Sequence, residues 1–286
     1  MEQNNEQQPA DATLRDLPDA EYEQIRAMIY DLCRLSFDKD KKPLVQYRLG
    51  KRLRDLGFSS YRQYLKFVKE QDGGEELTIL INALTTNLTY FFREPDHYDF
   101  LTETVFKPYA AGPRDARLRL WSAGCASGEE AYTVAMVMNE SIPDLDRRDA
   151  LILATDVSTR VLDIARRGDY PLERFKDTPA ELRDKYFEPA DQGGRARFRA
   201  LPALTRLVRF RHLNLMDKWP MSNPMDVILC RNVMIYFDKA TQQELVNRFY
   251  DALKPGGFLI VGHSETLTGV KHRFEHFRKT IHMKSE

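Results

Sequence analysis

The sequence has few cysteines, no net charge and no long apolar run. Its three cysteines, Cys33, Cys125 and Cys230, are an odd and widely spaced set. They fit no disulfide or metal-binding pattern and favour a reducing, cytoplasmic location. Lysine plus arginine and aspartate plus glutamate number 43 each, so any charge-based recognition must be local. The N-terminus lacks an apolar signal core, and no apolar run is long enough to span a bilayer.

The apolar residues are numerous and periodic enough to form a core. Of 286 residues, 42% are hydrophobic, which excludes a disordered or collagen-like chain. Residues 1–15 are polar and aperiodic and are expected to form a disordered tail. Residues 16–92 carry apolar side chains at helical spacing and predict a small all-helical N-terminal domain. We interpret residues 93–114 as a linker.

Strand-like and helix-like patterns alternate in residues 115–286. Apolar strands are expected at 117–121, 151–154, 227–230 and 258–261, with helical segments between them. This order predicts an α/β domain with a doubly wound, Rossmann-like parallel sheet. Residues 170–214 break the alternation and predict a small β-rich insertion, in which 195–200 and 207–212 are expected to pair as a hairpin.

A small-residue loop and an aspartate follow the first two strands of this domain. Residues 124–128 read Gly-Cys-Ala-Ser-Gly, and glycine allows a ligand to approach the backbone. The loop lacks the spacing of a phosphate-binding motif, and a merely structural turn is the alternative. Asp156 ends the next strand, where a carboxylate can accept the ribose hydroxyls of a nucleoside or cap the following helix. Together the two features favour nucleoside binding.

Two more polar segments stand where a ligand could bind. Arg231 and Asn232 follow the buried strand 227–230, at the ligand-binding end of such sheets, although a surface loop is the alternative. Residues 85–94 combine three hydroxyls, an amide, an arginine and three aromatic rings. They predict either a staple at the domain junction or a lid over the cleft. The cysteines have no paired histidine, and the six histidines show no ligand spacing, so neither a thiol nucleophile nor a metal site is predicted.

At these motifs the sequence resembles the CheR family, the chemotaxis receptor glutamate methyltransferases. The resemblance covers about residues 16–283. It is carried by ALTTNLTYFFRE at 83–94, WSAGCASGEEAY at 121–132, ATDVS at 154–158, Asn214-Leu215, CRNVMIYFD at 230–238 and KPGGFLIVGHSE at 254–265.

The resemblance implies an S-adenosylmethionine-dependent enzyme of sensory adaptation. It would methylate glutamate side chains of chemoreceptors, forming glutamyl methyl esters and S-adenosylhomocysteine. The resemblance places the cofactor contacts on Asn87, Thr89, Arg93, Glu130, Asp156, Asn214, Leu215, Arg231 and Asn232. We add Gly124 because of the loop that it opens.

The expected chemistry needs no strong base. A glutamate with a pKa of about 4.3 is already ionised near neutral pH, so positioning and desolvation of the carboxylate should dominate catalysis. We assign Arg93 to orienting the cofactor or the substrate carboxylate, and Tyr236 to a hydrogen bond near the attacking oxygen. A packed aromatic ring is the alternative for Tyr236. We assign Glu130 to the methionine ammonium group, with a solvent-facing glutamate as its alternative.

A basic stripe of Arg48, Lys51 and Arg52 runs along one predicted helix. It is either a solvated face or a docking surface for an acidic receptor helix.

Two other functions compete with the methyltransferase hypothesis. A noncatalytic adaptor that senses S-adenosylmethionine is disfavoured by the presence of both the 85–94 motif and the tyrosine loop. A nucleic-acid methyltransferase is disfavoured by the zero net charge, and we expect no nucleic-acid partner.

Overall fold

The computed structural model describes residues 16–70, 74–190 and 196–285, so the predicted tail at 1–15 lies outside the described residues. The chain divides into two compact units, residues 1–85 and 86–286. No helix among the described residues is long and apolar enough to cross a membrane.

The first unit is helical throughout its regular elements. Tyr61, Tyr64, Leu65 and Val68 recur at helical spacing and are all buried, as their pattern predicts. The elements of this unit are α1 (Asp19–Cys33), η1 (Lys39–Lys41), α2 (Lys42–Asp55), α3 (Tyr61–Glu70) and α4 (Glu75–Leu84). The predicted all-helical region is thereby confirmed.

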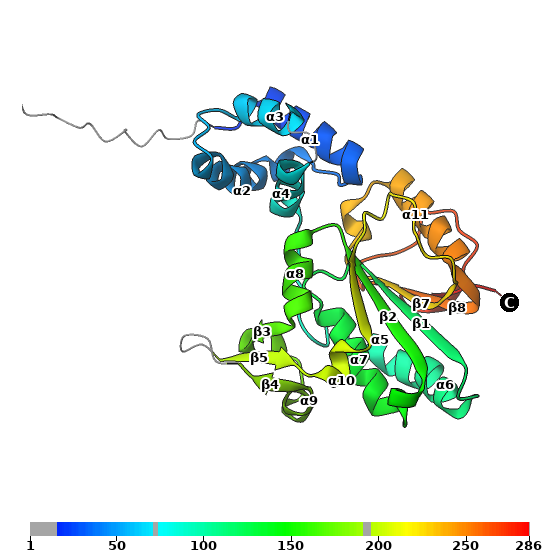
Figure 1. The fold of residues 1–286 in the computed structure, drawn as a ribbon. Coiled ribbons are helices and arrows are strands. Elements are labelled where there is room, and N and C mark those ends of the chain that lie inside the picture. The colour runs from blue at the N-terminus through cyan, green and yellow to red at the C-terminus, as the bar shows by residue number, and fades with distance from the viewer. Residues whose placement is uncertain (1–15, 71–73, 191–195, 286) are drawn as a thin grey trace, which may run out of the picture. The chain divides into compact units, whose positions relative to one another are not determined.

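The second unit is built on a seven-stranded sheet with the order β6-β2-β1-β7-β8-β10-β9. Its strands β2, β1, β7 and β8 are labelled in Figure 1. The first five strands in this order are parallel, and β10 is antiparallel to both β8 and β9. The strands are β1 (Arg117–Ala123), β2 (Asp149–Asp156), β6 (Val208–His212), β7 (Met225–Cys230), β8 (Leu253–Val261), β9 (Glu275–Arg278) and β10 (Ile281–Met283). This topology confirms the predicted α/β class.

Helices cover both faces of this sheet. Because side chains alternate along a strand, Leu120 and Trp121 of β1 point to opposite faces. Leu120 belongs to the core beneath α7 (Glu129–Ser141), whereas Trp121 packs with Phe249 of α11 (Lys239–Ala252). The other helical elements are α5 (Asp96–Phe100), the π-helical turn η2 (Leu101–Phe106), α6 (Lys107–Ala111), η3 (Leu145–Arg147), α8 (Thr159–Arg167), α10 (Pro202–Thr205) and η5 (Met234–Tyr236). The stretch 96–111, which we interpreted as linker, is therefore helical.

The β-rich insertion forms a separate small sheet with the order β3-β5-β4 (Figure 1). Its elements are β3 (Asp169–Pro171), η4 (Leu172–Phe175), α9 (Ala180–Tyr186), β4 (Phe187–Pro189) and β5 (Arg197–Ala200). The predicted hairpin is wrong: β5 pairs with β3 and β4, while β6 runs parallel to β2 in the main sheet. Helix α10 lies between β5 and β6 and carries the chain from one sheet to the other.

The segment 86–92 belongs to the second unit, although it lies within the region 16–92 that is predicted to be all-helical. Phe91 explains this placement. Its ring is fully buried and stacks on Phe175 at a centroid distance of 4.4 Å, with Tyr170 and Phe187 at 5.0 and 5.3 Å. The aromatic cluster of the insertion therefore holds the start of the second unit.

Candidate active site

The strand order brings most of the expected site residues to one edge of the sheet. Because β6, β2, β1 and β7 are parallel neighbours, their carboxyl ends meet at this edge, where open α/β sheets bind ligands. The residues at or just after these ends are Asn214 and Leu215 for β6, Asp156 for β2, Gly124 for β1, and Arg231 and Asn232 for β7.

The loop after β1 depends on glycine at both ends. Gly124 and Gly128 have φ angles of +91° and +95°, which favour glycine. A Cβ on Gly124 would lie 2.4 Å from Cγ2 of Val233, and one on Gly128 would lie 2.8 Å from Cβ of Ala165. Neither glycine position therefore has room for a side chain, which explains why glycine stands at both ends of this loop.

Asp156 connects this loop to the next helix. Its Oδ2 accepts the N–H of Ala126 at 2.9 Å and its Oδ1 accepts the N–H of Ser158 at 2.8 Å. Burial raises the pKa of this carboxyl, and the backbone donors act against that rise. The carboxylate thus contacts Ser158, the residue just before α8, which is the end of the helix that the capping alternative names. Since a carboxylate oxygen can accept two hydrogen bonds, both oxygens keep capacity for ribose hydroxyls.

The segment after β6 is joined directly to this aspartate. The N–H of Leu213 donates to the backbone oxygen of Asp156 at 3.1 Å. Asn214 then turns the chain, since its Oδ1 accepts the N–H of Met216 at 3.0 Å. Leu215 is buried with an exposure of 7%. The structure therefore joins Leu213 to Asp156, and Asn214 and Leu215 are the next residues along the chain.

Arg231 is the centre of a buried ionic network. Its side chain is only 2% exposed. Its guanidinium donates to Glu94 Oε2 at 3.0 Å, to Glu130 Oε2 at 3.0 Å and to the Tyr98 hydroxyl at 3.0 Å, and also to the backbone oxygen of Arg93. Arg231 is thus part of the protein interior, and its surface-loop alternative is wrong.

Two carboxylates share this guanidinium, with different consequences for their protonation. Burial raises the pKa of Glu130, which is 13% exposed and also accepts the Ser122 hydroxyl at 2.6 Å. At Glu94, burial also acts to raise the pKa, but the Arg231 charge and the N–H of His263 outweigh it and lower the pKa. The solvent-facing alternative for Glu130 is therefore wrong.

Residues 89–94, the second half of the segment 85–94, are fastened to the rest of the second unit. The guanidinium of Arg174, on η4, donates to the backbone oxygen of Thr89. The backbone oxygen of Arg174 accepts the N–H of Phe91 at 3.1 Å. Arg93 donates to the backbone oxygen of Leu88 at 3.0 Å. Thr89 is buried and Asn87 half-buried. Through Arg93 and Arg174, the segment that carries the expected cofactor contacts is joined to both β7 and the insertion.

Tyr236 ends the short helix η5 on the loop that begins with Arg231. Its side chain is half-buried, and its N–H donates to the backbone oxygen of Val233 at 3.2 Å. Asn232 adopts a left-handed φ of +59°, and its side-chain amide lies 3.4 Å from Glu94 Oε1. Arg93 is therefore joined to the Arg231 network by its backbone oxygen, which accepts from Arg231. Tyr236 is connected to the network through the chain, because it lies in the loop that begins with Arg231.

The basic stripe lies in the first unit, on α2. Arg52 forms an ion pair with the buried Glu76, which also accepts the Tyr64 hydroxyl at 2.9 Å. Arg48 donates to the backbone oxygens of Leu84 and Thr85 at 2.8 and 3.1 Å. Lys51 is exposed. Two of the three charges thus have structural contacts within their unit, and Lys51 is the one turned to solvent.

Glu94, Arg174 and Glu265 contact residues of the candidate site, although they are not among the residues predicted from the sequence. Glu94 and Glu265 stand inside the quoted motifs, but their partners are distant in sequence. Glu94 also belongs to a group of potential metal ligands with His97 and His263, whose ligand atoms lie within 4.8 Å of one another. Arg231 occupies the same Glu94 carboxylate, so this group is explained by the ionic network. All three cysteines are buried and outside disulfides.

Most of the chain matches two family models. Residues 20–85 match the CheR methyltransferase all-alpha domain, and residues 87–283 match the CheR methyltransferase SAM-binding domain. The chain belongs to the CheR methyltransferase family. Like the family, it is an S-adenosylmethionine-dependent methyltransferase, and the cluster at the carboxyl edge of the sheet lies within its SAM-binding domain.

Curated relatives extend the CheR match over almost the full length. The chain is 38% identical to a chemotaxis protein methyltransferase of Borreliella burgdorferi, over 88% of this chain and 90% of the relative. It is 37% identical to chemotaxis protein methyltransferase 2 of Pseudomonas aeruginosa, over 92% of each chain. It is 36% identical to the chemotaxis protein methyltransferase of Escherichia coli, over 94% of this chain and 92% of the relative.

Proposed function

We propose that this CheR-family chain transfers a methyl group from S-adenosylmethionine to glutamate carboxylates of chemotaxis receptors, forming glutamyl methyl esters. The observation that carries the proposal is the convergence of Asp156, the 124–128 loop and the Arg231 network at the carboxyl edge of a SAM-binding domain. The similarity to chemotaxis protein methyltransferases supports the receptor as substrate.

The residues present fit this cofactor. Asp156 keeps acceptor capacity for ribose hydroxyls, the glycine loop allows close approach of the backbone, and the Glu130 carboxylate is suited to the methionine ammonium group. When bound, S-adenosylmethionine supplies an electrophilic methyl group on a sulfonium. Asn87, Thr89, Asn214, Leu215 and Asn232 complete the proposed contacts.

The protein's own contribution to methyl transfer is positioning. A substrate glutamate near neutral pH is already ionised, so no group of the enzyme has to remove a proton. We assign to Arg93 the orientation of the substrate or cofactor carboxylate, and to Tyr236 a hydroxyl hydrogen bond near the attacking oxygen. Both groups would hold the reactants in line, which can contribute much of the rate enhancement.

Mass spectrometry of receptors tests the proposed function. We expect incubation of the full chain with isotopically labelled S-adenosylmethionine and receptor fragments to add base-labile methyl esters to glutamate. Nucleic acid serves as the competing substrate. Label in nucleic acid would contradict the proposal, and cofactor binding without transfer to any receptor fragment would favour the adaptor hypothesis.

Replacing Asp156 by alanine is expected to weaken cofactor binding strongly. The change removes up to two hydrogen bonds between ribose hydroxyls and a charged acceptor, each worth about 1.5–3 kcal/mol. Calorimetry with S-adenosylhomocysteine measures the loss. Asp163→Ala, an exposed carboxylate on α8, is the matched control, and an unchanged affinity in Asp156→Ala would remove Asp156 from the ribose site.

Replacing Tyr236 by phenylalanine is expected to lower kcat with little change in cofactor affinity. If the hydroxyl acts mainly in the transition state, its removal affects the rate and not the ground-state complex, by about 10- to 100-fold for one hydrogen bond. Steady-state kinetics on receptor fragments provides the measurement, with Tyr250→Phe on α11 as control. Wild-type turnover in Tyr236→Phe would show that Tyr236 is only a packed ring.

The receptor segments that dock are proposed to be acidic helices, recognised partly by the basic stripe. Because Arg48 and Arg52 have structural contacts, Lys51→Glu is the cleanest charge reversal. We expect it to slow receptor methylation at low salt and to make the rate less salt-dependent, since surface charges act through the encounter rate. Lys69→Glu, exposed on α3, is the control. Equal rates for wild type and Lys51→Glu across a salt series would identify the stripe as a solvated face.

A further inference from the structure

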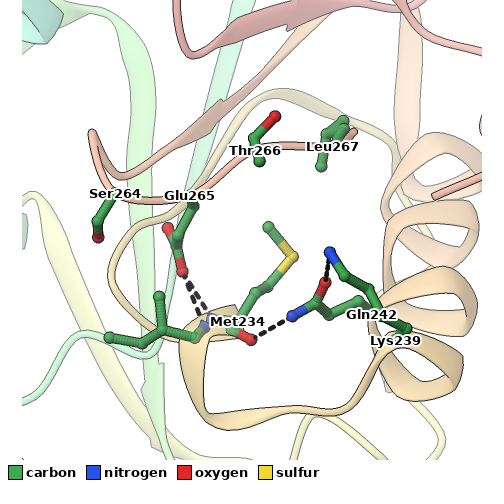
Figure 2. Close-up of a pocket in the computed structure, with 8 residues that line it drawn as sticks. Met234, Lys239, Gln242, Ser264, Glu265, Thr266 and Leu267 are labelled. Atoms are coloured by element: carbon green, nitrogen blue, oxygen red, sulfur yellow. Dashed lines mark hydrogen bonds between the residues drawn. The ribbon is translucent and has the colours of Figure 1, made fainter. Parts of the chain in front are cut away.

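Glu265 makes an unusual set of contacts at the edge of the proposed site. Its carboxylate is buried, with the residue 7% exposed, and it accepts hydrogen bonds from five backbone N–H groups. Oε1 accepts from Val233, Met234 and Ile235 at 2.9, 2.8 and 3.3 Å, and Oε2 accepts from Asn232 and Gly262 at 2.8 and 2.6 Å. Figure 2 shows the carboxylate facing the turn at Met234.

Four of these donors are consecutive, which identifies what the carboxylate holds. The N–H groups of 232 and 233 lie just before η5, and those of 234 and 235 belong to its first two residues. The first N–H groups of a helix have no partners within the helix itself. On the other side of the turn, Gln242 donates to the backbone oxygen of Met234 at 2.9 Å (Figure 2). It also donates to the backbone oxygen of Phe237 at 3.0 Å. Side chains thus hold both the donors and the acceptors of this turn.

The turn connects residues to which we assign chemistry. Arg231 and Asn232 stand at its start and Tyr236 at its end. Asn232 adopts the left-handed φ of +59°, which is unfavourable for most residues and needs support from its surroundings. A Cβ on Gly262 would lie 2.6 Å from the Asn232 side-chain amide and 2.9 Å from Glu265 Oε2. The end of β8 therefore approaches the turn closely, and Glu265 joins the two.

We propose that Glu265 is a positioning residue of the methyltransferase site, which fixes peptide groups 232–235 so that Asn232 and Tyr236 face the cofactor and substrate while Arg231 holds Glu130 in place. The inference rests on the proposed function, because it takes these three residues as site residues. Glu265 itself touches no reactant. Both of its oxygens accept hydrogen bonds from backbone N–H groups. The positioning role requires the carboxylate form, because this form offers two acceptor atoms.

Glu265→Gln is the direct test because glutamine has the same shape but only one acceptor oxygen. The amide nitrogen of the glutamine would face backbone N–H donors, so the hydrogen bonds to one of the two side-chain positions must break. We expect the amides of 232–235 to exchange with solvent at least about tenfold faster in the cofactor-free variant, while the amides of α11 are unchanged. We also expect the Kd for S-adenosylhomocysteine to rise by about tenfold or more, as for lost hydrogen bonds to a charged acceptor.

Two further variants separate positioning from general destabilisation. Leu267→Ala removes a buried side chain two residues away but leaves the carboxylate in place, so it should not accelerate exchange at 232–235 selectively. Glu265→Asp keeps both oxygens on a shorter side chain, and we expect exchange and affinity between those of wild type and Glu265→Gln. It also serves as the second test if the glutamine variant fails to fold.

The outcomes are distinguishable from failure of the proposed function. Wild-type exchange at 232–235 and a Kd within twofold of wild type in Glu265→Gln would overturn the positioning role. An equal, selective acceleration in Leu267→Ala would overturn it as well. If the wild-type chain itself does not bind S-adenosylhomocysteine, the cofactor site is wrong, and the exchange rates still decide whether Glu265 holds the turn.

Discussion

Arg231→Met is expected to lower the free energy of unfolding by about 3–5 kcal/mol, since removing one partner of a buried ion pair leaves the other charge uncompensated. Here both Glu94 and Glu130 lose the same guanidinium. The variant should also lose measurable affinity for S-adenosylhomocysteine, because Glu130 and the 85–94 segment lose their common anchor. Urea unfolding at pH 7 and calorimetry measure the two effects.

The loss of unfolding free energy in Arg231→Met should become smaller at low pH. Without the guanidinium, burial raises the pKa values of the two carboxyls above those in the unfolded chain. A group with a raised folded-state pKa favours folding at low pH and loses that contribution as pH rises. The destabilisation should therefore shrink as the pH falls from 7 toward 5.

Matched variants define what would contradict this expectation. Arg278→Met, on an exposed position of β9, should change stability little. Adding Glu130→Gln to Arg231→Met should restore part of the lost stability, because one buried charge is removed. A loss below about 1 kcal/mol in Arg231→Met would be typical of a surface ion pair and would show that the network is not buried as described.

Gly124→Ala is expected to destabilise the protein and to disturb the site at the same time. The left-handed φ of +91° costs a non-glycine residue about 1–2 kcal/mol. The new Cβ would lie 2.4 Å from Val233 Cγ2, and overpacking adds about 1–3 kcal/mol. Because Val233 belongs to the turn held by Glu265, relief of the clash should displace Arg231 and Asn232 and weaken S-adenosylhomocysteine binding.

Gly256→Ala is the matched control for this substitution. Gly256 has a similar positive φ of +73°, but a Cβ there would meet nothing within 4 Å. It should show only the backbone cost of about 1–2 kcal/mol and wild-type cofactor affinity. Thermal unfolding and calorimetry on both variants provide the comparison. Equal losses of unfolding free energy in the two variants would show that Val233 moves away from the new Cβ without further destabilisation.

Much of the candidate site could be predicted because its residues follow recognisable local elements. Asp156 and Arg231 each stand at the end of a short apolar strand, and parallel strands bring such ends to one edge. The environment of these residues was not predictable. The Arg231 guanidinium meets Glu94, 137 residues away, and Glu130, 101 residues away. No local pattern encodes which carboxylates a buried charge will find.

The misplaced hairpin illustrates the same limit for the fold. β5 and β6 are short, close in sequence and separated by turn-like residues, which is typical of a hairpin. The structure instead pairs β6 with β2, where Ile152 lies opposite Val208 and Ala154 opposite Phe210. Burial of Val208 and Phe210 against the main sheet outweighed the local pairing, and propensity alone cannot compare the two.

The sequence by itself determined the helical first unit, the α/β second unit, the glycine loop and the polar residues at the strand ends, because each depends on short-range periodicity or on backbone preferences. Only the tertiary structure decided that Glu94 and Glu130 share Arg231, that Arg174 and the aromatic cluster hold the 85–94 segment, and that Glu265 holds the turn before Tyr236. These contacts satisfy buried charges and buried N–H groups, whose partners are selected by where the chain packs and not by neighbours in sequence.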